Sequence, residues 1–153
     1  MNERFLARGK RKDNGKLIYG DLIIDQYGKY YTHPNANAFS VNEYNLAKCI
    51  QMIEVIPETV GQCTGLKDKN GKLIFEGDIV KADGYIFFVN FGKCGGVANN
   101  EDYGYIGYYL DGYDEITKKA LRIYGLRDDI CYFTDIEIIG NVYDNPELLQ
   151  KER

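Results

Sequence analysis

The only histidine, His33, is the first residue to consider for chemistry, because imidazole is the usual general base near neutral pH. It lies in the run Tyr-Thr-His-Pro, residues 31–34, which reads as a turn. No sequence motif for a nucleophile or a metal site accompanies it. A histidine in a surface turn is therefore the favoured interpretation, and a general base is the weaker one.

Carboxylates are the second group that could do acid–base chemistry. They cluster in two places, which hold Asp111, Asp114 and Glu115, and then Asp128 and Asp129. Nothing in the sequence shows that these side chains converge, and solvated loops are the simpler explanation. We therefore predict no catalytic residue and a protein that is not an enzyme.

Glycines and cysteines suggest two further kinds of site without completing either. Residues 92–96 (GKCGG) lack the Lys-Ser/Thr ending of a phosphate-binding P-loop, and we expect a flexible loop there. The four cysteines, Cys49, Cys63, Cys94 and Cys131, form no C-x-x-C pair. We expect reduced, largely buried thiols and no metal ion or cofactor.

Basic residues crowd two short stretches and give a first binding hypothesis. They are Lys10, Arg11, Lys12 and Lys16 in one stretch, and Lys67, Lys69 and Lys72 in the other. Two cationic hairpin tips could hold a phosphate backbone. The net charge is −4, however, whereas dedicated nucleic-acid binders are usually basic. Turns that are charged because they contact water are the preferred alternative.

Tyrosine gives a second hypothesis, since the chain has 14 tyrosines and no tryptophan. In a strand over residues 103–110, Tyr103, Tyr105 and Tyr109 would share one face, with Tyr108 on the other. Tyrosine combines apolar area with a hydroxyl group and suits protein interfaces. The same rings could instead fill a thin barrel core, and the sequence leaves both options open.

A repeat indicates which elements position the basic residues. Residues 11–23 read RKDNGKLIYGDLI, and residues 67–80 read KDKNGKLIFEGDIV. Asn-Gly between apolar runs is a strong hairpin signal, because both residues tolerate positive φ. Each copy should therefore be a β-hairpin that continues through a Gly-Asp break into another apolar strand, with Glu76 as an inserted residue in the second copy.

Charge predicts that the two turns differ. A two-residue loop in the first copy would set Asp13 opposite Lys16, a favourable cross-strand pair. The same loop in the second copy would set two lysines opposite each other. A three-residue loop there would instead set Asp68 opposite Lys72, with Gly71 in the left-handed position of a bulge.

Other strands follow from apolar runs and turn residues. Residues 65–91 should form an antiparallel meander with a second two-residue turn at Asp83-Gly84. A strand over 53–56 should end at the proline that follows it. A strand that starts at 135 should lead into a short helical turn over 144–149.

Two segments, residues 42–52 and 114–124, remain open between helix and strand. The remaining pattern of short strands and glycine-rich turns predicts an all-β protein with little helix. We expect an N-terminal β subdomain over residues 1–60 and a small barrel or sandwich over residues 61–153, or one compact unit containing both. No apolar run is long enough for a membrane span and no secretory signal is present, so we expect a cytoplasmic protein.

Three stretches together resemble the YopX family, namely residues 8–23, 57–80 and 136–149. The resemblance implies a phage or prophage protein in a bacterial cell, with an SH3-like small barrel and additional β-hairpins, assembled as a homo-oligomer. The family has no assigned catalytic residues, so none is carried over. Cys63 stands where the family often has an aromatic residue, which we interpret as a packing variation.

From the residues and the resemblance we predict a non-catalytic, self-associating module that binds an unidentified phage or host protein. The alternative is a nucleic-acid-binding module that uses the cationic hairpin tips. The candidate binding residues are the basic residues of the two tips together with Tyr103, Tyr105 and Tyr109. We expect no cofactor, metal ion or membrane partner.

Overall fold

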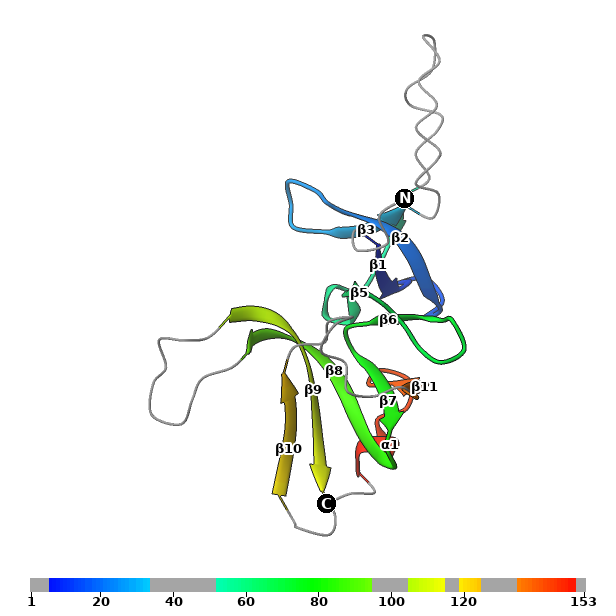
Figure 1. Ribbon diagram of the computed structural model, residues 1–153. Helices are drawn as coiled ribbons and strands as arrows, with labels where there is room; N and C mark the ends of the chain where they lie inside the picture. Colours follow the sequence, from blue (N-terminus) through cyan, green and yellow to red (C-terminus); the bar gives the residue numbers. More distant parts are fainter. Residues whose placement is uncertain (1–5, 34–51, 95–104, 115–118, 125–134, 151–153) are drawn as a thin grey trace. The chain divides into compact units, whose positions relative to one another are not determined.

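The computed structural model describes residues 6–33, 52–94, 105–114, 119–124 and 135–150 of the chain (Figure 1). It divides into two compact units, residues 1–63 and residues 64–153. Each unit is described by itself below.

Unit 1 is an antiparallel sheet built from short strands. Its elements are β1 (Ala7–Lys10), β2 (Leu17–Ile24), β3 (Tyr30–His33), β4 (Ile53–Glu54) and a 3-10 turn (Pro57–Thr59), in the strand order β4-β3-β2-β1. The first residues of β5 (Gly61–Lys67) pair with β1 on its other edge. The predicted strand over 53–56 is shorter than expected, because β4 ends at Glu54 and Val55 forms only an isolated bridge with Arg11. Pro57, whose φ is fixed and which lacks an N–H group, begins the 3-10 turn. His33 is the last residue of β3, opposite Asp21, and the predicted turn there is wrong.

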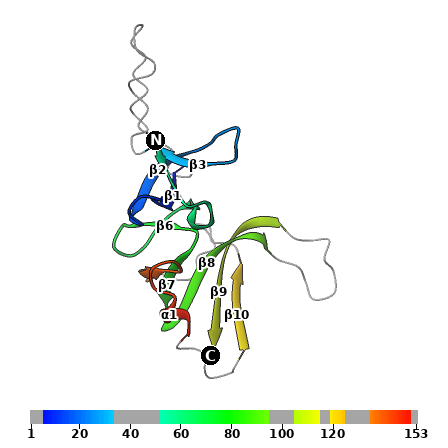
Figure 2. The same cartoon turned by 180° about the vertical axis from the view of Figure 1, so that it is seen from behind.

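Unit 2 contains the end of β5, its neighbour β6 (Leu73–Phe75) and a second antiparallel sheet. The second sheet has the order β10-β9-β8-β7-β11, made of β7 (Asp78–Ala82), β8 (Tyr85–Cys94), β9 (Tyr105–Asp114), β10 (Lys119–Tyr124) and β11 (Glu137–Asn141). Figure 2 shows this sheet from behind, with β11 beside β7. The short helix α1 (Glu147–Gln150) follows, which confirms the predicted helical turn.

These strands confirm the all-β class and resolve part of one open segment. Residues 119–124 form strand β10, so the helical alternative is wrong there. Residues 42–51 lie outside the described part of the chain. That unit 2 is an SH3-like barrel remains a prediction from the resemblance.

The core of unit 2 follows from the alternation of side chains along a strand. Phe87 and Val89 are fully buried on one face of β8, against Val80 of β7 and Leu110 of β9. Ile74, Ala82 and Ile136 complete this cluster. A side chain one position along a strand points to the opposite face, so the register of β8 is fixed by which residues are buried.

The predicted meander is confirmed in its turns and wrong in its continuity. Asp83 and Gly84 both have positive φ, of 48° and 87°, as the Asp-Gly turn requires. The strand order, however, places β6 and β7 in different sheets. The chain changes sheet at Gly77, which has a φ of 81°. The buried Asp78 carboxylate spans this break by accepting a 2.8 Å hydrogen bond from the Phe75 N–H.

The two repeats differ in structure at the inserted residue Glu76. In the first copy, β2 runs through Gly20 without a break, so the predicted Gly-Asp break is wrong there. An extra residue reverses the face to which the following side chains point, and the second copy accommodates it by leaving the first sheet.

The predicted flexible loop over residues 92–96 is wrong at its start, because Gly92 and Cys94 lie within β8. Gly95 and Gly96 lie outside the described residues.

Candidate functional site

The turn of the second repeat has the predicted three-residue loop, closed at Asp68 and Lys72. The Asp68 N–H donates to the Lys72 carbonyl and the Gly71 N–H donates to the Asp68 carbonyl, both at 2.8 Å. One carboxylate oxygen of Asp68 accepts the N–H groups of Asn70 and Lys72, each at 2.9 Å. Gly71 has a φ of 80°, so the predicted bulge geometry is confirmed.

This turn is docked on strand β11 through its backbone and side chains. The Lys69 N–H donates to the Ile136 carbonyl at 2.8 Å, and the Ile138 N–H donates to the outer carboxylate oxygen of Asp68 at 3.3 Å. The Lys69 ammonium group also forms an ion pair with Glu137 at 2.5 Å. The turn therefore recognises two alternate residues of an extended strand and the side chain between them.

The carboxylate of Asp68 is buried, and its charge is held by backbone donors. Burial disfavours the charged form, but hydrogen bonds from the N–H groups of Lys72, Ile138 and Asn70 outweigh it and lower the pKa of Asp68. The ionised form is therefore the one that holds the turn on β11.

The positive φ at Gly71 predicts an asymmetry between two adjacent substitutions. Gly71→Val should lower the free energy of unfolding by about 1–2 kcal/mol, because a β-branched residue is strained in the left-handed region. A Cβ at Gly71 would meet no atom within 4 Å, so the cost is conformational and not steric. Lys72→Ala removes an exposed side chain and should change stability by less than about 0.5 kcal/mol. Urea denaturation measures both, and equal midpoints would contradict the turn assignment.

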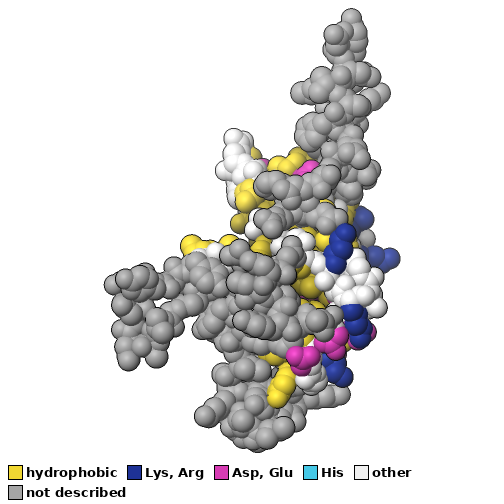
Figure 3. Space-filling view, in the orientation of Figure 1, with side chains coloured by type: hydrophobic (Ala, Val, Ile, Leu, Met, Phe, Trp, Pro, Cys, Tyr) yellow, Lys and Arg dark blue, Asp and Glu magenta, His cyan; other side chains and the backbone are white. Residues whose placement is uncertain are grey.

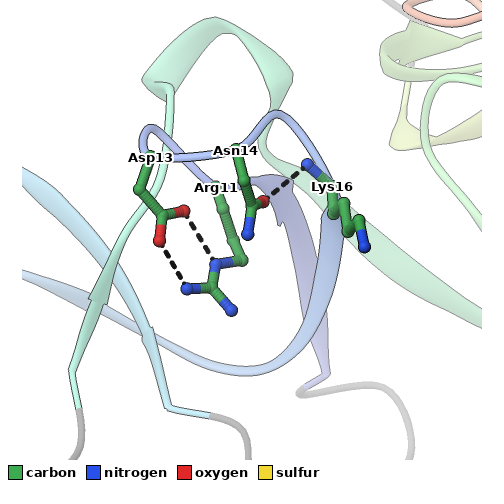
Figure 4. Close-up of polar contacts among 4 residues, drawn as sticks. All are labelled: Arg11, Asp13, Asn14 and Lys16. Carbon is green, nitrogen blue, oxygen red and sulfur yellow. Dashed lines mark hydrogen bonds and ion pairs between the residues drawn. The ribbon is translucent and has the colours of Figure 1, made fainter.

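The turn of the first repeat is different from the prediction. The Arg11 N–H donates to the Lys16 carbonyl and the Gly15 N–H donates to the Arg11 carbonyl, both at 2.9 Å, so the loop has four residues and not two. Asp13 lies within this loop and does not face Lys16. It instead accepts two hydrogen bonds from the Arg11 guanidinium, while Asn14 accepts the Lys16 N–H (Figure 4). A bidentate partner two residues away and an amide cap favour the longer loop.

A third turn, Asp25–Lys29 between β2 and β3, was not anticipated from the sequence. One Asp25 carboxylate oxygen accepts the N–H groups of Tyr27 and Lys29 at 2.9 Å, and the Gly28 N–H donates to the Asp25 carbonyl at 3.0 Å. Gly28 has a φ of 76°. The same hydrogen bonds close the second-repeat turn, and both stretches read Asp-x-x-Gly-Lys. The Asp-x-x-Gly-Lys spacing, and not the longer repeat, is the sequence feature that could have predicted this turn.

The structure pairs several of the predicted cationic residues with carboxylates. Arg11 pairs with Asp13, Lys12 pairs with Glu54 at 2.7 Å, and Lys69 pairs with Glu137 as described. The Lys12 ammonium group donates a hydrogen bond to the Glu54 carboxylate. This bond raises the pKa of Lys12 and lowers the pKa of Glu54. In Figure 3, acidic side chains lie beside the lower basic ones.

The other predicted basic residues have varied surroundings. The side chains of Lys16, Lys67 and Lys72 are exposed, whereas Lys10 is half-buried and its N–H donates to the Thr59 hydroxyl at 2.8 Å. Exposure is compatible with either a solvated turn or a binding surface, so these residues do not by themselves favour phosphate binding.

A pocket of about 350 Å³ in unit 1 is lined by the first turn and β4. Its lining residues are Arg11, Lys12, Asp13, Met52, Ile53 and Glu54. The two cations in this set pair with the two carboxylates, so the lining carries no net charge with which to attract an anion.

The tyrosine-rich strand β9 forms a two-stranded extension with β8. The register of β7 with β8 ends at Phe88, and that of β10 with β9 ends at Tyr109. Beyond these points, residues 91–94 and 105–108 pair with each other (Figure 1). We call these residues the β8–β9 ribbon.

The ribbon carries exposed apolar side chains on the face that continues the core. Phe91 lies opposite Tyr108, with ring centroids 4.9 Å apart, and Tyr108 also packs against the core cluster. Phe91 is 44% exposed and Ile106 is 74% exposed. Neither of these two residues was singled out from the sequence. The sequence shows β8 as a long apolar strand. Only the strand pairing in the structure shows that β8 extends beyond its neighbour β7 and so exposes these residues.

The predicted tyrosine face is described only in part. Tyr109 is half-buried on the face opposite Tyr108, next to Gly92, as strand alternation predicts. Tyr103 lies outside the described residues, and Tyr105 is placed in β9 by its backbone alone. Cys63 is buried, as predicted. Cys49 and Cys131 lie outside the described residues.

Two other kinds of site, a metal centre and a membrane-spanning helix, are absent from the described ranges. In those ranges, histidine, cysteine and carboxylate side chains form no group of three that could hold a metal ion. Among the same residues, no helix has the length and apolar character that crossing a membrane requires.

Comparison with known proteins adds a family match. The family model described as YopX protein matches residues 7–150, which is nearly the whole chain of 153 residues. No curated protein matches the sequence.

Proposed function

The chain belongs to the YopX family, and from this premise we propose that it is a non-catalytic, self-associating module that binds a protein of the phage or its bacterial host. The proposed location is the bacterial cytoplasm. The observation that carries the proposal is the apolar face of the β8–β9 ribbon.

The ribbon supports self-association because of what it exposes. A two-stranded hairpin is only marginally stable in water by itself, and it gains stability when an apolar face is covered. Phe91 and Ile106 extend the face that is buried further along the same strands by Phe87 and Leu110. Contiguous exposed apolar area usually marks a protein interface, and a second copy is the commonest partner.

Light scattering at micromolar concentration tests this proposal. The wild-type chain should have a mass above the 17.5 kDa of one copy. Ile106→Ser should shift the population towards the monomer, because it removes an apolar side chain that is 74% exposed, more than Phe91 is. Ile24→Ser is the matched control, since Ile24 is 53% exposed in unit 1 and lies outside the ribbon. A wild-type monomer, or equal masses for both variants, would contradict the proposal.

The nucleic-acid alternative has weaker support. Arg11, Lys12 and Lys69 already pair with carboxylates, which reduces the charge available for phosphate. A pull-down from phage-infected cells with and without nuclease separates the two functions. A protein retained after nuclease treatment supports the proposal, and binding that disappears with nuclease and weakens with salt supports the alternative.

A further inference from the structure

The two Asp-x-x-Gly-Lys turns have the same internal hydrogen bonds but different surroundings. The turn at 68–72 holds strand β11, as described above. The turn at 25–29 has the same geometry at the tip of the β2–β3 hairpin, with Tyr27 79% exposed and Ile24 53% exposed. One turn in this chain is therefore seen with its ligand, and the ligand is an extended strand.

The groups that bind the strand can be read from the docked turn. Its second residue donates a backbone N–H to a strand carbonyl, here Lys69 to Ile136. Its aspartate accepts, on the outer carboxylate oxygen, the N–H of the residue two positions further along, here Ile138. This spacing matches alternate residues of a β-strand, which point their backbone groups to the same edge.

Both groups are present on the turn at 25–29. Gln26 is exposed, and its backbone N–H has no acceptor among the described residues. From the described part of the chain, the outer oxygen of Asp25 accepts only a long hydrogen bond of 3.4 Å, from the Tyr31 hydroxyl. A carboxylate oxygen has two lone pairs, so it can accept a strand N–H as well.

We infer that the Asp25–Lys29 turn is a docking site for an extended strand of a partner protein. The strand offers a carbonyl to Gln26 and, two residues further on, an N–H to Asp25. Exposed Tyr27 and Ile24 supply apolar contact for its side chains. Gln26 replaces Lys69 of the docked turn, so the partner strand has no need of an acidic residue between the two contacts.

This inference deepens the proposed function, on which it rests, by stating the chemistry of the partner. A second copy of the chain is a poor source of the strand, because its β11 is already held by its own 68–72 turn. We assign the strand to a different protein with an exposed strand edge, and weaker self-association of Gln26→Pro would assign it to another edge strand of a second copy, such as β10, instead. The ribbon and the turn are formed by different segments of the chain, and different experiments test them.

Two substitutions remove one contact each while preserving the turn. Gln26→Pro deletes the N–H donor, and proline is favoured at this position because Gln26 and Tyr27 do not have positive φ. Asp25→Asn keeps one oxygen for the Tyr27 and Lys29 N–H groups but converts the outer oxygen to a donor. Lys69→Pro is the matched control for the donor, since it should disrupt docking of β11 and lower the melting temperature, whereas Gln26→Pro should not.

The probe is a capped six-residue peptide with the sequence of residues 135–140, DIEIIG, which carries the required spacing. In ¹⁵N-labelled full-length protein, the amide resonances of Tyr27 and Gly28 should shift with peptide at millimolar concentration. Gln26→Pro and Asp25→Asn should each weaken this binding about tenfold, the expected effect of losing one hydrogen bond. The inference would be overturned by resonance shifts confined to the 68–72 turn or by no shifts at all. Equal peptide binding by the wild type, Gln26→Pro and Asp25→Asn would also overturn it. Light scattering of the same samples reports self-association separately, so failure of the turn and failure of the proposed function are distinguishable.

Discussion

Replacing Gly112 by alanine should lower the free energy of unfolding by about 2–3 kcal/mol. Gly112 lies opposite Phe87, whose ring packs over it within the core of unit 2. An added Cβ would lie 2.6 Å from the Cδ1 atom of Phe87 and 2.7 Å from the carbonyl oxygen of Ile86. Real Cβ atoms do not approach this closely, so the fully buried ring or the backbone of β8 must move. Urea denaturation measures the loss.

Gly92→Ala is the matched control in the same pair of strands. A Cβ at Gly92 would first meet the Tyr109 ring at 3.7 Å, which is an ordinary contact. Its φ is not positive, so alanine fits the backbone and restricts the unfolded chain. We expect a midpoint equal to or above that of the wild type. If Gly112→Ala and Gly92→Ala unfolded at the same urea concentration, the packing of Phe87 on Gly112 would be refuted.

Replacing Asp68 by alanine should have a similarly large effect, a loss of about 2–4 kcal/mol. The substitution leaves three backbone N–H groups without their acceptor, those of Asn70, Lys72 and Ile138. Leaving a buried donor unsatisfied costs about 1–3 kcal/mol, and these groups are partly buried. Asp25→Ala is the matched control, because it removes the same cap from a turn that holds no strand. It should destabilise the protein much less in thermal or urea unfolding.

Asp68 should also contribute to the pH dependence of stability. Its pKa is lower in the folded protein than the ordinary value of 3.8. The unfolded chain therefore binds a proton more readily, and the stabilisation is present above pH 4 and lost as the pH falls through the folded pKa. Asp68→Asn should be less stable than the wild type at pH 7, and the difference should shrink below pH 4. A constant difference from pH 7 to pH 2.5 would contradict this assignment.

Local signals in the sequence were sufficient for most strands and for two of the hairpin turns. Asp83-Gly84 fixes its turn because both residues adopt positive φ without a large cost. The choice of a three-residue loop closed by Asp68 and Lys72 came from one cross-strand charge pair, and it is confirmed. Pro57 begins the 3-10 turn for a covalent reason, since its ring fixes φ. In each case the deciding interaction joins residues that are near neighbours in the chain.

The same reasoning failed where two local solutions were close in energy. In the first repeat, Asp13 could face Lys16 across a short loop or pair with Arg11 within a longer one. The two arrangements differ in free energy by less than about 1 kcal/mol, which is the contribution of one cross-strand pair. The Asp25–Lys29 turn contains no Asn-Gly pair, and its fold depends on the Asp-x-x-Gly-Lys spacing, in which Asp25 accepts the N–H groups of Tyr27 and Lys29.

The sequence by itself determined the all-β class, the family, the turns at Asn70-Gly71 and Asp83-Gly84 and the closing helical turn. These depend on period-two apolar runs, glycine and proline conformations and capping groups, all of which act over a few residues. Only the tertiary structure decided that β6 and β7 belong to different sheets, that Lys69 is held by Glu137, and that Phe91 and Ile106 are exposed. These features depend on which distant strands pair and where the pairing ends. Such long-range contacts are selected by burial summed over whole sheets, and no single residue in the sequence encodes them.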